Sequence, residues 1–230
     1  YALFMEMGCG KSKVLLDNMA VLYAKGTINA ALIVAPKGVY DNWIEGEIPI
    51  HLPDYIKRRV YRWSPAETQK NKKKRDEILK FSHDLDIVVM NVEALSTKKG
   101  TDFAAKFLLN KRALFTIDES TSIKSPSAAR TKNALRLAKY AVHRRILTGS
   151  PVTRSPLDLY TQCEFLDPAL LGYSSYYSFR ARYAEMVDRS AGGRTFKQVI
   201  GYKNLEELNE IIQPFSCRVL KKDCLDLPNK

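Results

Sequence analysis

Residues 5–12, Met-Glu-Met-Gly-Cys-Gly-Lys-Ser, form a glycine-rich segment whose groups suit the binding of a phosphate chain. Glycines in such a loop let successive backbone N–H groups converge on an anion, the lysine reaches the terminal phosphates, and the serine hydroxyl can ligate Mg²⁺. The predicted nucleotide-binding residues are Gly8, Cys9, Gly10, Lys11, Ser12 and Lys13. The usual pattern G-x-x-x-x-G-K-[ST] begins with glycine where this chain has Met5, so the loop needs support from a second motif. An ordinary strand-turn-helix corner would explain the glycines but not Lys-Ser at this offset.

An acidic pair, Asp118-Glu119, closes the apolar run at 113–117 and supplies the second half of a nucleotide site. Asp118 can hold Mg²⁺ directly or through water, and Glu119 is placed to polarise the attacking water. The predicted catalytic residues are therefore Glu119 and Lys11, and the predicted metal ligands are Ser12 and Asp118. The alternative is that Asp118 or Ser120 caps the next helix, as Asp or Ser after a strand commonly does. Ser125-Pro126 offers a better helix start further on, which favours the catalytic interpretation.

Short apolar runs that alternate with helical stretches must position these groups. Strands are predicted at 1–5, 30–35, 59–63, 86–90, 113–117 and 145–147, and helices at 11–23, 64–81, 101–109, 127–140 and 157–166. Continuous apolar runs of this length suit strands buried on both faces of a parallel sheet. Most of these runs end in a polar signature. The pattern predicts an open, doubly wound, mainly parallel α/β sheet, whose ligands bind beyond the carboxyl ends of the strands.

The character of the sequence changes after Asp167-Pro168. Tyrosines and arginines between 173 and 183 lie in helical sequence, a loop is predicted at 190–194, and a further helix at 205–212. Aromatic and arginine side chains could stack on bases, but an amphipathic helix packing on a neighbour is the commoner arrangement. We expect residues 1–168 to form the nucleotide-binding lobe and residues 169–230 to form a C-terminal helical appendage.

The composition gives weaker indications. The chain has 37 Lys+Arg against 25 Asp+Glu, a net charge of +12, which is typical of nucleic-acid binders. The lysine run at 70–75 favours a solvated helix face over a DNA contact. Four cysteines without C-x-x-C spacing indicate a reducing compartment. No apolar run is long enough to span a membrane, so we expect an intracellular protein, in cytoplasm or nucleus.

Several segments in order resemble the first RecA-like lobe of the Swi/Snf-related ATPases, in the second helicase superfamily. These segments are 7–12, 32–37 with Trp43, 116–119 and 147–151. Further similarity at 157–160, 165–168, 203–208 and 218–228 extends the resemblance over nearly the whole chain. The chain departs from the family's pattern at two places. Residues 118–121 are Asp-Glu-Ser-Thr where the family usually has Asp-Glu-Ala-His, and residues 153–154 are Thr-Arg where it usually has Gln-Asn. The upstream glutamine motif that reads adenine is not in the sequence, so ATP is assigned by analogy alone.

The resemblance implies hydrolysis of ATP with Mg²⁺, coupled to translocation along double-stranded DNA. It implies contacts to DNA from Pro36, Lys37, Asn91, Glu93 and Ser150, and coupling between nucleotide and DNA through Thr148, Gly149 and Pro151. It also implies a second RecA-like lobe in the same polypeptide, whose arginines would reach the nucleotide. We therefore interpret the chain as a fragment of a longer protein and expect it to be nearly inactive alone.

Two other functions remain open at this stage. A strand-separating DNA or RNA helicase of the same superfamily would be activated by single strands or RNA. A non-catalytic nucleic-acid-binding scaffold would keep the fold without the chemistry. Intact Lys11, Asp118 and Glu119 argue against the scaffold.

Overall fold

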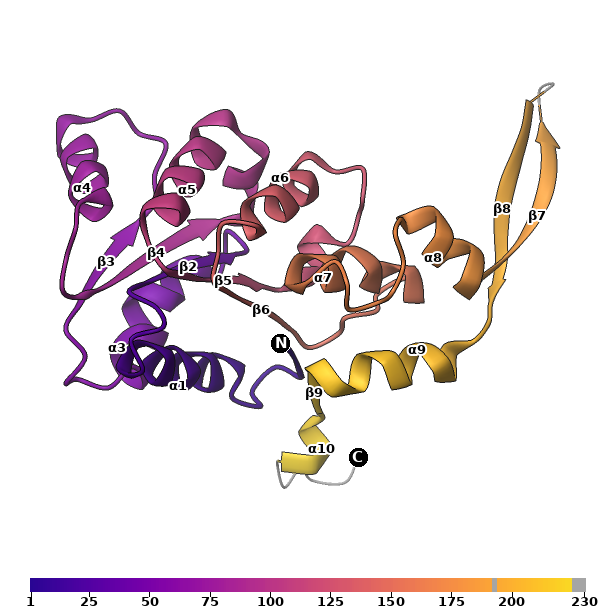
Figure 1. Cartoon of the computed structure of the whole chain (residues 1–230), viewed down its shortest axis with the longest axis horizontal. Helices are drawn as coiled ribbons and strands as arrows, with labels where there is room; N and C mark the ends of the chain where they lie inside the picture. The colour runs from indigo at the N-terminus through magenta and orange to yellow at the C-terminus, as the bar shows by residue number, and fades with distance from the viewer. Residues whose placement is uncertain (192–193, 225–230) are drawn as a thin grey trace.

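A seven-stranded sheet forms the centre of the computed structural model, which describes residues 1–191 and 194–224. The strand order is β3-β4-β2-β5-β6-β1-β9, and every neighbouring pair is parallel (Figure 1). The strands are β1 (Ala2–Met5), β2 (Ala30–Ala35), β3 (Arg58–Arg62), β4 (Leu85–Asn91), β5 (Ala113–Asp118), β6 (His143–Thr148) and β9 (Ser216–Val219). The predicted doubly wound α/β fold is confirmed.

Helices cover both faces of the sheet, because alternate residues of each buried strand point to opposite sides. These helices are α1 (Lys11–Ala24), α2 (Tyr40–Asn42), α3 (Ile48–His51), α4 (Gln69–Leu79), α5 (Lys98–Asn110), α6 (Ala129–Ala138) and α7 (Leu159–Leu166). In β2, Leu32 and Val34 pack with α5, α6 and α7, whereas Ile33 and Ala35 pack with α1 and the run from α2 to α3. Figure 1 shows α4, α5 and α6 on one side of the sheet and α1 and α3 on the other.

The register of the sheet aligns the carboxyl ends of its central strands. Ala35 of β2 lies opposite Asn91 of β4, and Asp118 of β5 lies opposite Leu147 of β6. Phe4 of β1 lies opposite Thr148. The loops that follow β1, β2, β4, β5 and β6 therefore leave the sheet along one edge.

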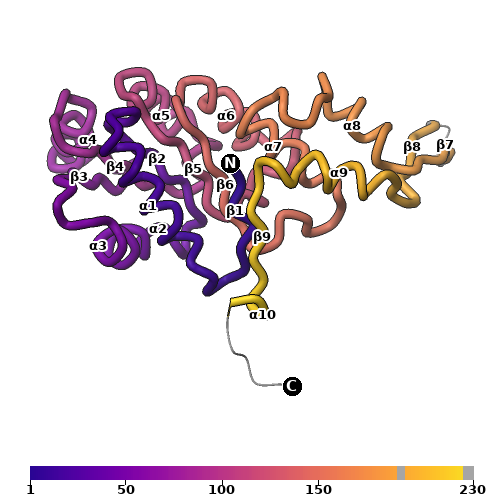
Figure 2. The backbone as a smooth tube through the Cα atoms, turned by 60° about the horizontal axis from the view of Figure 1, so that its bottom comes forward, coloured from indigo at the N-terminus to yellow at the C-terminus, as the bar shows by residue number. Residues whose placement is uncertain are grey.

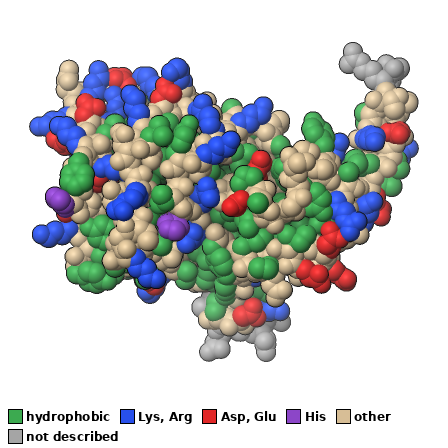
Figure 3. Space-filling view, in the orientation of Figure 1, with side chains coloured by type: hydrophobic (Ala, Val, Ile, Leu, Met, Phe, Trp, Pro, Cys, Tyr) green, Lys and Arg blue, Asp and Glu red, His purple; other side chains and the backbone are tan. Residues whose placement is uncertain are grey.

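One local expectation needs correction, and one helical run was not predicted at all. This run passes from α2 through the π-helix η1 (Trp43–Glu47) to α3, and it contains Pro49 in the first turn of α3, where proline is tolerated. Helix α4 begins at Gln69 rather than at Ser64, because the Thr68 hydroxyl accepts a hydrogen bond from the Asn71 N–H and caps it. The predicted lysine run lies on this exposed helix, where Figure 3 shows Lys and Arg crowded over α4.

The C-terminal segment is not helical throughout, contrary to expectation. It contains α8 (Tyr176–Tyr183) and α9 (Leu205–Ile212), but between them an antiparallel hairpin of β7 (Ala184–Ala191) and β8 (Arg194–Tyr202) projects from the lobe (Figure 1). Valine, threonine and isoleucine in this stretch favour strands. Most of the predicted loop at 190–194 belongs to the two strands; Gly192 and Gly193 lie outside the described residues.

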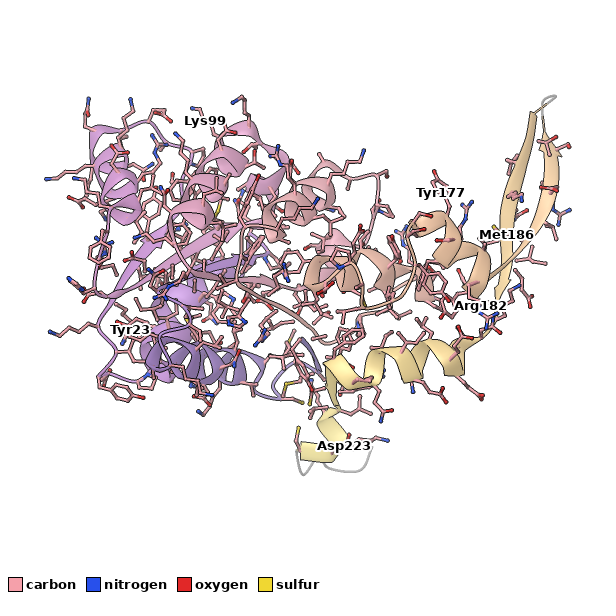
Figure 4. All side chains as sticks on the ribbon, viewed as in Figure 1. Tyr23, Lys99, Tyr177, Arg182, Met186 and Asp223 are labelled. Atoms are coloured by element: carbon pink, nitrogen blue, oxygen red, sulfur yellow. The ribbon has the colours of Figure 1, made fainter. Side chains whose placement is uncertain are left out.

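The last described part of the chain returns to the sheet. The 3₁₀ turn η5 (Gln213–Phe215) leads into β9, which pairs with β1, and α10 (Lys221–Cys224) follows. Figure 2 shows β9 running beside β1, and Figure 4 labels Asp223 on α10. The similarity noted at Leu227-Pro228 lies outside the described residues. No helix in the described ranges is long and apolar enough to cross a membrane.

Candidate functional site

The phosphate loop connects β1 to the N-terminus of α1. Gly8 and Gly10 have φ angles of 87° and 82°, in the left-handed region where glycine carries no steric cost, and Gly10 is the N-cap of α1. The Lys11 ammonium donates hydrogen bonds to the carbonyl oxygens of Met5 (2.8 Å) and Glu6 (3.3 Å). The loop therefore presents its lysine and the positive end of the helix dipole at the same place.

Lys13 differs from the other predicted loop residues. Its ammonium pairs with Asp17 at 2.7 Å, one turn further along α1, and both side chains are about half exposed. Ser12, by contrast, is only partly exposed in the first turn of the helix. The structure thus places the Lys13 charge on the outer face of α1 and away from Lys11.

Asp118, the last residue of β5, is buried and held by two neutral donors. The indole Nε1 of Trp43 donates to its Oδ2 at 2.9 Å, and the backbone N–H of Glu119 donates to its Oδ1 at 3.0 Å. Burial raises the pKa of Asp118, whereas the hydrogen bond from Trp43 acts in the opposite direction. Trp43 belonged to a predicted motif, but no sequence signal showed that it reaches Asp118 across 75 residues.

A second buried aspartate shows why Asp118 is suited to a cation. Asp86, in β4, is paired with Arg59 at 2.7 Å and with Lys111 at 2.6 Å, so its charge is balanced within the fold. Asp118 has no such ion pair in the described part of the chain. A buried carboxylate without a cationic partner fits Mg²⁺, which typically takes one or two protein oxygens and completes its shell with phosphates and water.

The described residues contain no group of three or more His, Cys, Asp or Glu that could hold a metal by itself. The metal ligands predicted from the sequence, the Asp118 carboxylate and the Ser12 hydroxyl, lie at the end of β5 and in the first turn of α1. A set this small suits a cation that arrives with the nucleotide rather than a resident metal centre.

Glu119 adopts a left-handed conformation, with φ 48° and ψ 63°. Its Oε2 accepts a hydrogen bond from the Thr148 hydroxyl at 3.0 Å, and that hydroxyl in turn accepts one from the Ser150 N–H at 3.2 Å. A non-glycine residue in this region is uncommon and clusters at functional sites. Glu119 precedes the 3₁₀ helix η3 (Ser120–Ile123) without a side-chain cap, and the Ser120 hydroxyl donates to the Gln162 Oε1.

A cavity of about 440 Å³ joins the three carboxyl-edge loops. Lys11 lines it from the phosphate loop, Glu119 from the end of β5, and Thr148, Gly149 and Ser150 from the end of β6. It also contains residues that the sequence did not single out for the site: Glu6, Met7, Thr121, Thr153 and Lys221. A larger, mainly apolar cavity of about 610 Å³ lies against α9 and shares only Pro151 with the predicted site.

The loop after β6 is fixed by Asp158, which was not among the predicted site residues. Its Oδ2 accepts hydrogen bonds from the Thr153 N–H (3.1 Å), the Thr153 hydroxyl (2.8 Å) and the Arg154 N–H (3.0 Å). The Lys124 ammonium lies 3.4 Å away. Asp158 ends the 3₁₀ helix η4 (Pro156–Asp158), directly before α7, and thereby holds Thr153 at the cavity wall.

The predicted DNA-contact residues lie on the same sheet edge but outside the cavity, except for Ser150. Pro36 and Lys37 follow β2, and Asn91 ends the adjacent β4. Lys37, Glu93 and Ser150 are exposed, whereas the Asn91 Oδ1 accepts the Ala94 N–H and caps the 3₁₀ helix η2 (Val92–Ser96). Along this edge the carboxyl ends of β4, β2 and β5 lie in that order, so Lys37, just after β2, comes between Asn91 of β4 and Asp118 of β5.

A parallel sheet with a phosphate loop after β1 and an acidic pair after β5 defines the class of RecA-like P-loop domains. The chain belongs to the SNF2-related domain family, which it matches over residues 2–230. That match covers all the loops described above.

Known relatives are similar over most of this chain but are much longer. Protein CHROMATIN REMODELING 24 of Arabidopsis thaliana is 29% identical over 226 residues, which is 95% of this chain and 20% of the relative. The TATA-binding protein-associated factor mot1 of Schizosaccharomyces pombe is 30% identical over 203 residues, 87% of this chain and 10% of the relative. The SWI2/SNF2 ATPase core of Sulfolobus solfataricus, solved with double-stranded DNA, has the same fold, with a TM-score of 0.68 and 24% identity over 99% of this chain and 42% of that one.

Proposed function

We propose that this chain is the ATP-binding lobe of a DNA-dependent ATPase, which couples ATP hydrolysis to translocation along double-stranded DNA. The observation that carries the proposal is the shared cavity of Lys11, Glu119 and Thr148, which come from three different strand ends. A cation for phosphate and a carboxylate for water are the groups that phosphoryl transfer to water requires. Residues 1–168 would form the lobe, and residues 169–230 a protrusion whose β9 strand returns to it.

The roles follow from where each group lies. The backbone N–H groups of the loop and the Lys11 ammonium would bind the phosphates, while Ser12 and Asp118 would hold Mg²⁺. Bound Mg²⁺ would neutralise charge on the phosphate oxygens. Glu119 would orient the attacking water, because Thr148 fixes one of its oxygens and leaves the other to accept a proton.

Coupling between nucleotide and DNA is proposed to run through the loop after β6. The Thr148 hydroxyl links Glu119 to the Ser150 N–H, so a shift of this loop would turn the catalytic carboxylate. Gly149 packs on the phosphate loop: a Cβ there would lie 3.4 Å from Glu6 Cα. Together with Pro151, these residues join the two halves of the site.

Double-stranded DNA is the proposed partner because one relative is named for chromatin remodelling and a structural neighbour was solved with duplex. Lys37, Pro36 and the backbone from Asn91 to Glu93 would contact its phosphates, with Ser150 beside the cavity, and the net charge of +12 favours the contact. A second RecA-like lobe of the same polypeptide would supply opposing arginines. An intracellular location follows from DNA as the partner.

The test is an ATPase assay of the complete polypeptide with duplex DNA, single-stranded DNA and RNA as separate activators. The proposal expects the largest stimulation with duplex, and no activity in the Lys11→Ala variant. Preferential stimulation by RNA or single strands would contradict duplex translocation, and absence of hydrolysis with every activator would contradict an ATPase.

A further inference from the structure

Two cysteines from opposite ends of the described chain meet at the phosphate loop. The Cys224 thiol donates a hydrogen bond to the sulfur of Cys9, and the two sulfur atoms lie 3.1 Å apart. Cys9 is the residue between the two left-handed glycines of the loop, and Cys224 ends α10. Both cysteines are free thiols, 215 residues apart in sequence.

Backbone contacts, and not only the thiol contact, bring α10 to the loop. The Glu6 N–H donates to the Val219 carbonyl at 3.0 Å, and the Lys221 N–H donates to the Glu6 carboxylate at 2.6 Å. Val219 belongs to β9, which pairs with β1 along its whole length. The start of α10 is thus fixed to Glu6, which lies three positions before Cys9 in the phosphate loop.

The other two cysteines differ from this pair. Cys163 is buried in the core, and burial raises its pKa to about 12, so it remains an unreactive thiol. Cys217 lies in β9, partly buried opposite Leu3. In the described ranges, Cys9 and Cys224 are the only cysteines whose sulfur atoms lie within hydrogen-bonding distance of each other.

We propose that Cys9 and Cys224 are a redox modification site, whose reversible disulfide closes the phosphate loop to nucleotide. The oxidant is a peroxide, or a low-molecular-weight disulfide acting by exchange. With hydrogen peroxide, the Cys9 sulfur attacks one peroxide oxygen, which gives a sulfenic acid and one water. The Cys224 sulfur then attacks the Cys9 sulfur and releases a second water, so that two thiols and one peroxide yield one disulfide and two waters.

The cross-link acts on the loop because of where Cys9 lies. A disulfide needs its sulfur atoms about 2.05 Å apart, so the Cys9 side chain must move toward α10. The Cys9 N–H already donates to the Glu6 carbonyl at 3.1 Å, and the flanking glycines make the loop compliant. Tethering Cys9, the residue between the two glycines, draws the N–H groups of the loop away from a bound phosphate. It also fixes α10 against the cavity, because Lys221 of α10 is part of the lining.

The experiment compares the reduced and the peroxide-treated protein. Free thiols are blocked, and peptides are mapped by mass spectrometry for a Cys9–Cys224 link. In parallel, binding of a fluorescent Mg-ADP analogue is titrated before oxidation, after oxidation and after dithiothreitol. We expect the linked peptide together with at least tenfold weaker nucleotide binding, restored by dithiothreitol.

Two variants separate the disulfide from other oxidation. Cys224→Ser removes the partner thiol and leaves the loop sequence intact, so its binding should be the same with and without peroxide. Cys217→Ser, the matched control from the adjacent strand, should respond as the parent protein does. An equal loss of binding in oxidised Cys224→Ser would overturn the proposal, because oxidation of Cys9 alone would then suffice.

The remaining outcomes are also decisive. Absence of the linked peptide after peroxide treatment overturns the proposal, and so does a linked protein that binds nucleotide unchanged. The choice of nucleotide as the ligand rests on the proposed function, whereas the peptide map does not. If the reduced protein binds no nucleotide, both the proposed function and the closure of the loop to nucleotide are contradicted. The peptide map still decides whether Cys9 and Cys224 form a disulfide.

Discussion

The indole nitrogen of Trp43 lies 2.9 Å from Oδ2 of Asp118, and both side chains are buried. This hydrogen bond joins the helical run after β2 to the end of β5, so a residue outside the phosphate loop and acidic pair orients the proposed metal ligand. The other carboxylate oxygen, Oδ1, accepts a hydrogen bond from the Glu119 N–H. Each oxygen of Asp118 therefore has its own donor, and the two donors together fix the orientation of the carboxylate.

Replacing Trp43 by Phe should weaken the response to Mg²⁺. A hydrogen bond to a charged group is worth about 1.5–3 kcal/mol, so the Mg²⁺ concentration for half-maximal nucleotide binding should rise about tenfold or more. The measurement is a Mg²⁺ titration with a fluorescent nucleotide. Trp63→Phe is the matched control, since Trp63 is also buried but packs on the other face of the sheet, with Leu32 and Val34. Equal Mg²⁺ dependence in the two variants would refute the role of Trp43.

Lys11→Ala and Glu119→Gln should separate binding from chemistry. The first removes the cation that meets the phosphates, so nucleotide binding should be lost. The second keeps a hydrogen-bonding oxygen for Thr148 but removes the proton acceptor, so binding should persist while hydrolysis falls about 10²-fold or more. Nucleotide titration and single-turnover hydrolysis measure the two effects. A Glu119→Gln protein unable to bind nucleotide would show that Glu119 has been misassigned.

Asp158→Asn should loosen the loop that carries Thr153, in a pH-dependent way. Burial acts to raise the pKa of Asp158, but the Arg154 and Thr153 donors and nearby Lys124 lower it overall. A lowered folded-state pKa stabilises the fold above the unfolded value, about 3.9, and this contribution is lost as pH falls through the folded value. We expect a loss of about 1–2 kcal/mol at pH 7 that shrinks below about pH 4.

Thermal unfolding of the parent and the Asp158→Asn protein at pH 7 and below pH 4 tests this expectation. The control is Asp167→Asn, because Asp167 is exposed and its side chain accepts one backbone hydrogen bond, from Ala169. A difference between parent and Asp158→Asn that is the same at both pH values would mean that the charge of Asp158 is irrelevant to the loop.

Lys37→Ala should weaken duplex binding evenly across DNA sequences. If Lys37 neutralises one phosphate, the slope of log affinity against log salt should decrease in magnitude by about one. Lys25→Ala is the control, since Lys25 is exposed at the far end of α1, on the opposite edge of the sheet. Fluorescence anisotropy over a salt series gives both slopes, and identical slopes would remove Lys37 from the interface.

The strands and the residues at their ends could be predicted because those signals are local. Runs such as 30–35 and 113–117 are apolar throughout, as buried parallel strands require, and the polar residues that follow them meet at one edge by topology. Contacts across the sheet were not visible in the same way. Trp43, which reaches Asp118, begins a π-helical turn between 43 and 47 that has no sequence signature here.

The hairpin was missed for a different reason. Tyrosine and arginine before 184 fit an amphipathic helix, and α8 is indeed helical up to Tyr183, where its hydroxyl donates to Glu207 of α9 at 2.9 Å. Arg182 pairs with the same carboxylate (Figure 4 labels Arg182 at the base of the hairpin). These side chains fix the point at which the helix ends, through a partner more than twenty residues away. A local pattern cannot supply that information.

The position of β1 between β6 and β9 determines when the lobe can be completed during synthesis. Among the strands described here β1 is translated before the others, yet Phe4 pairs with Thr148 on one side and with Arg218 on the other. Strands β2, β4 and β5 can associate as soon as they leave the ribosome, whereas β1 must wait for partners of high sequence separation, which form slowly. Of these strands the earliest to be made is therefore the last to be paired on both sides, and we expect a nascent chain that ends before β6 to have an associated sheet centre but no anchored phosphate loop.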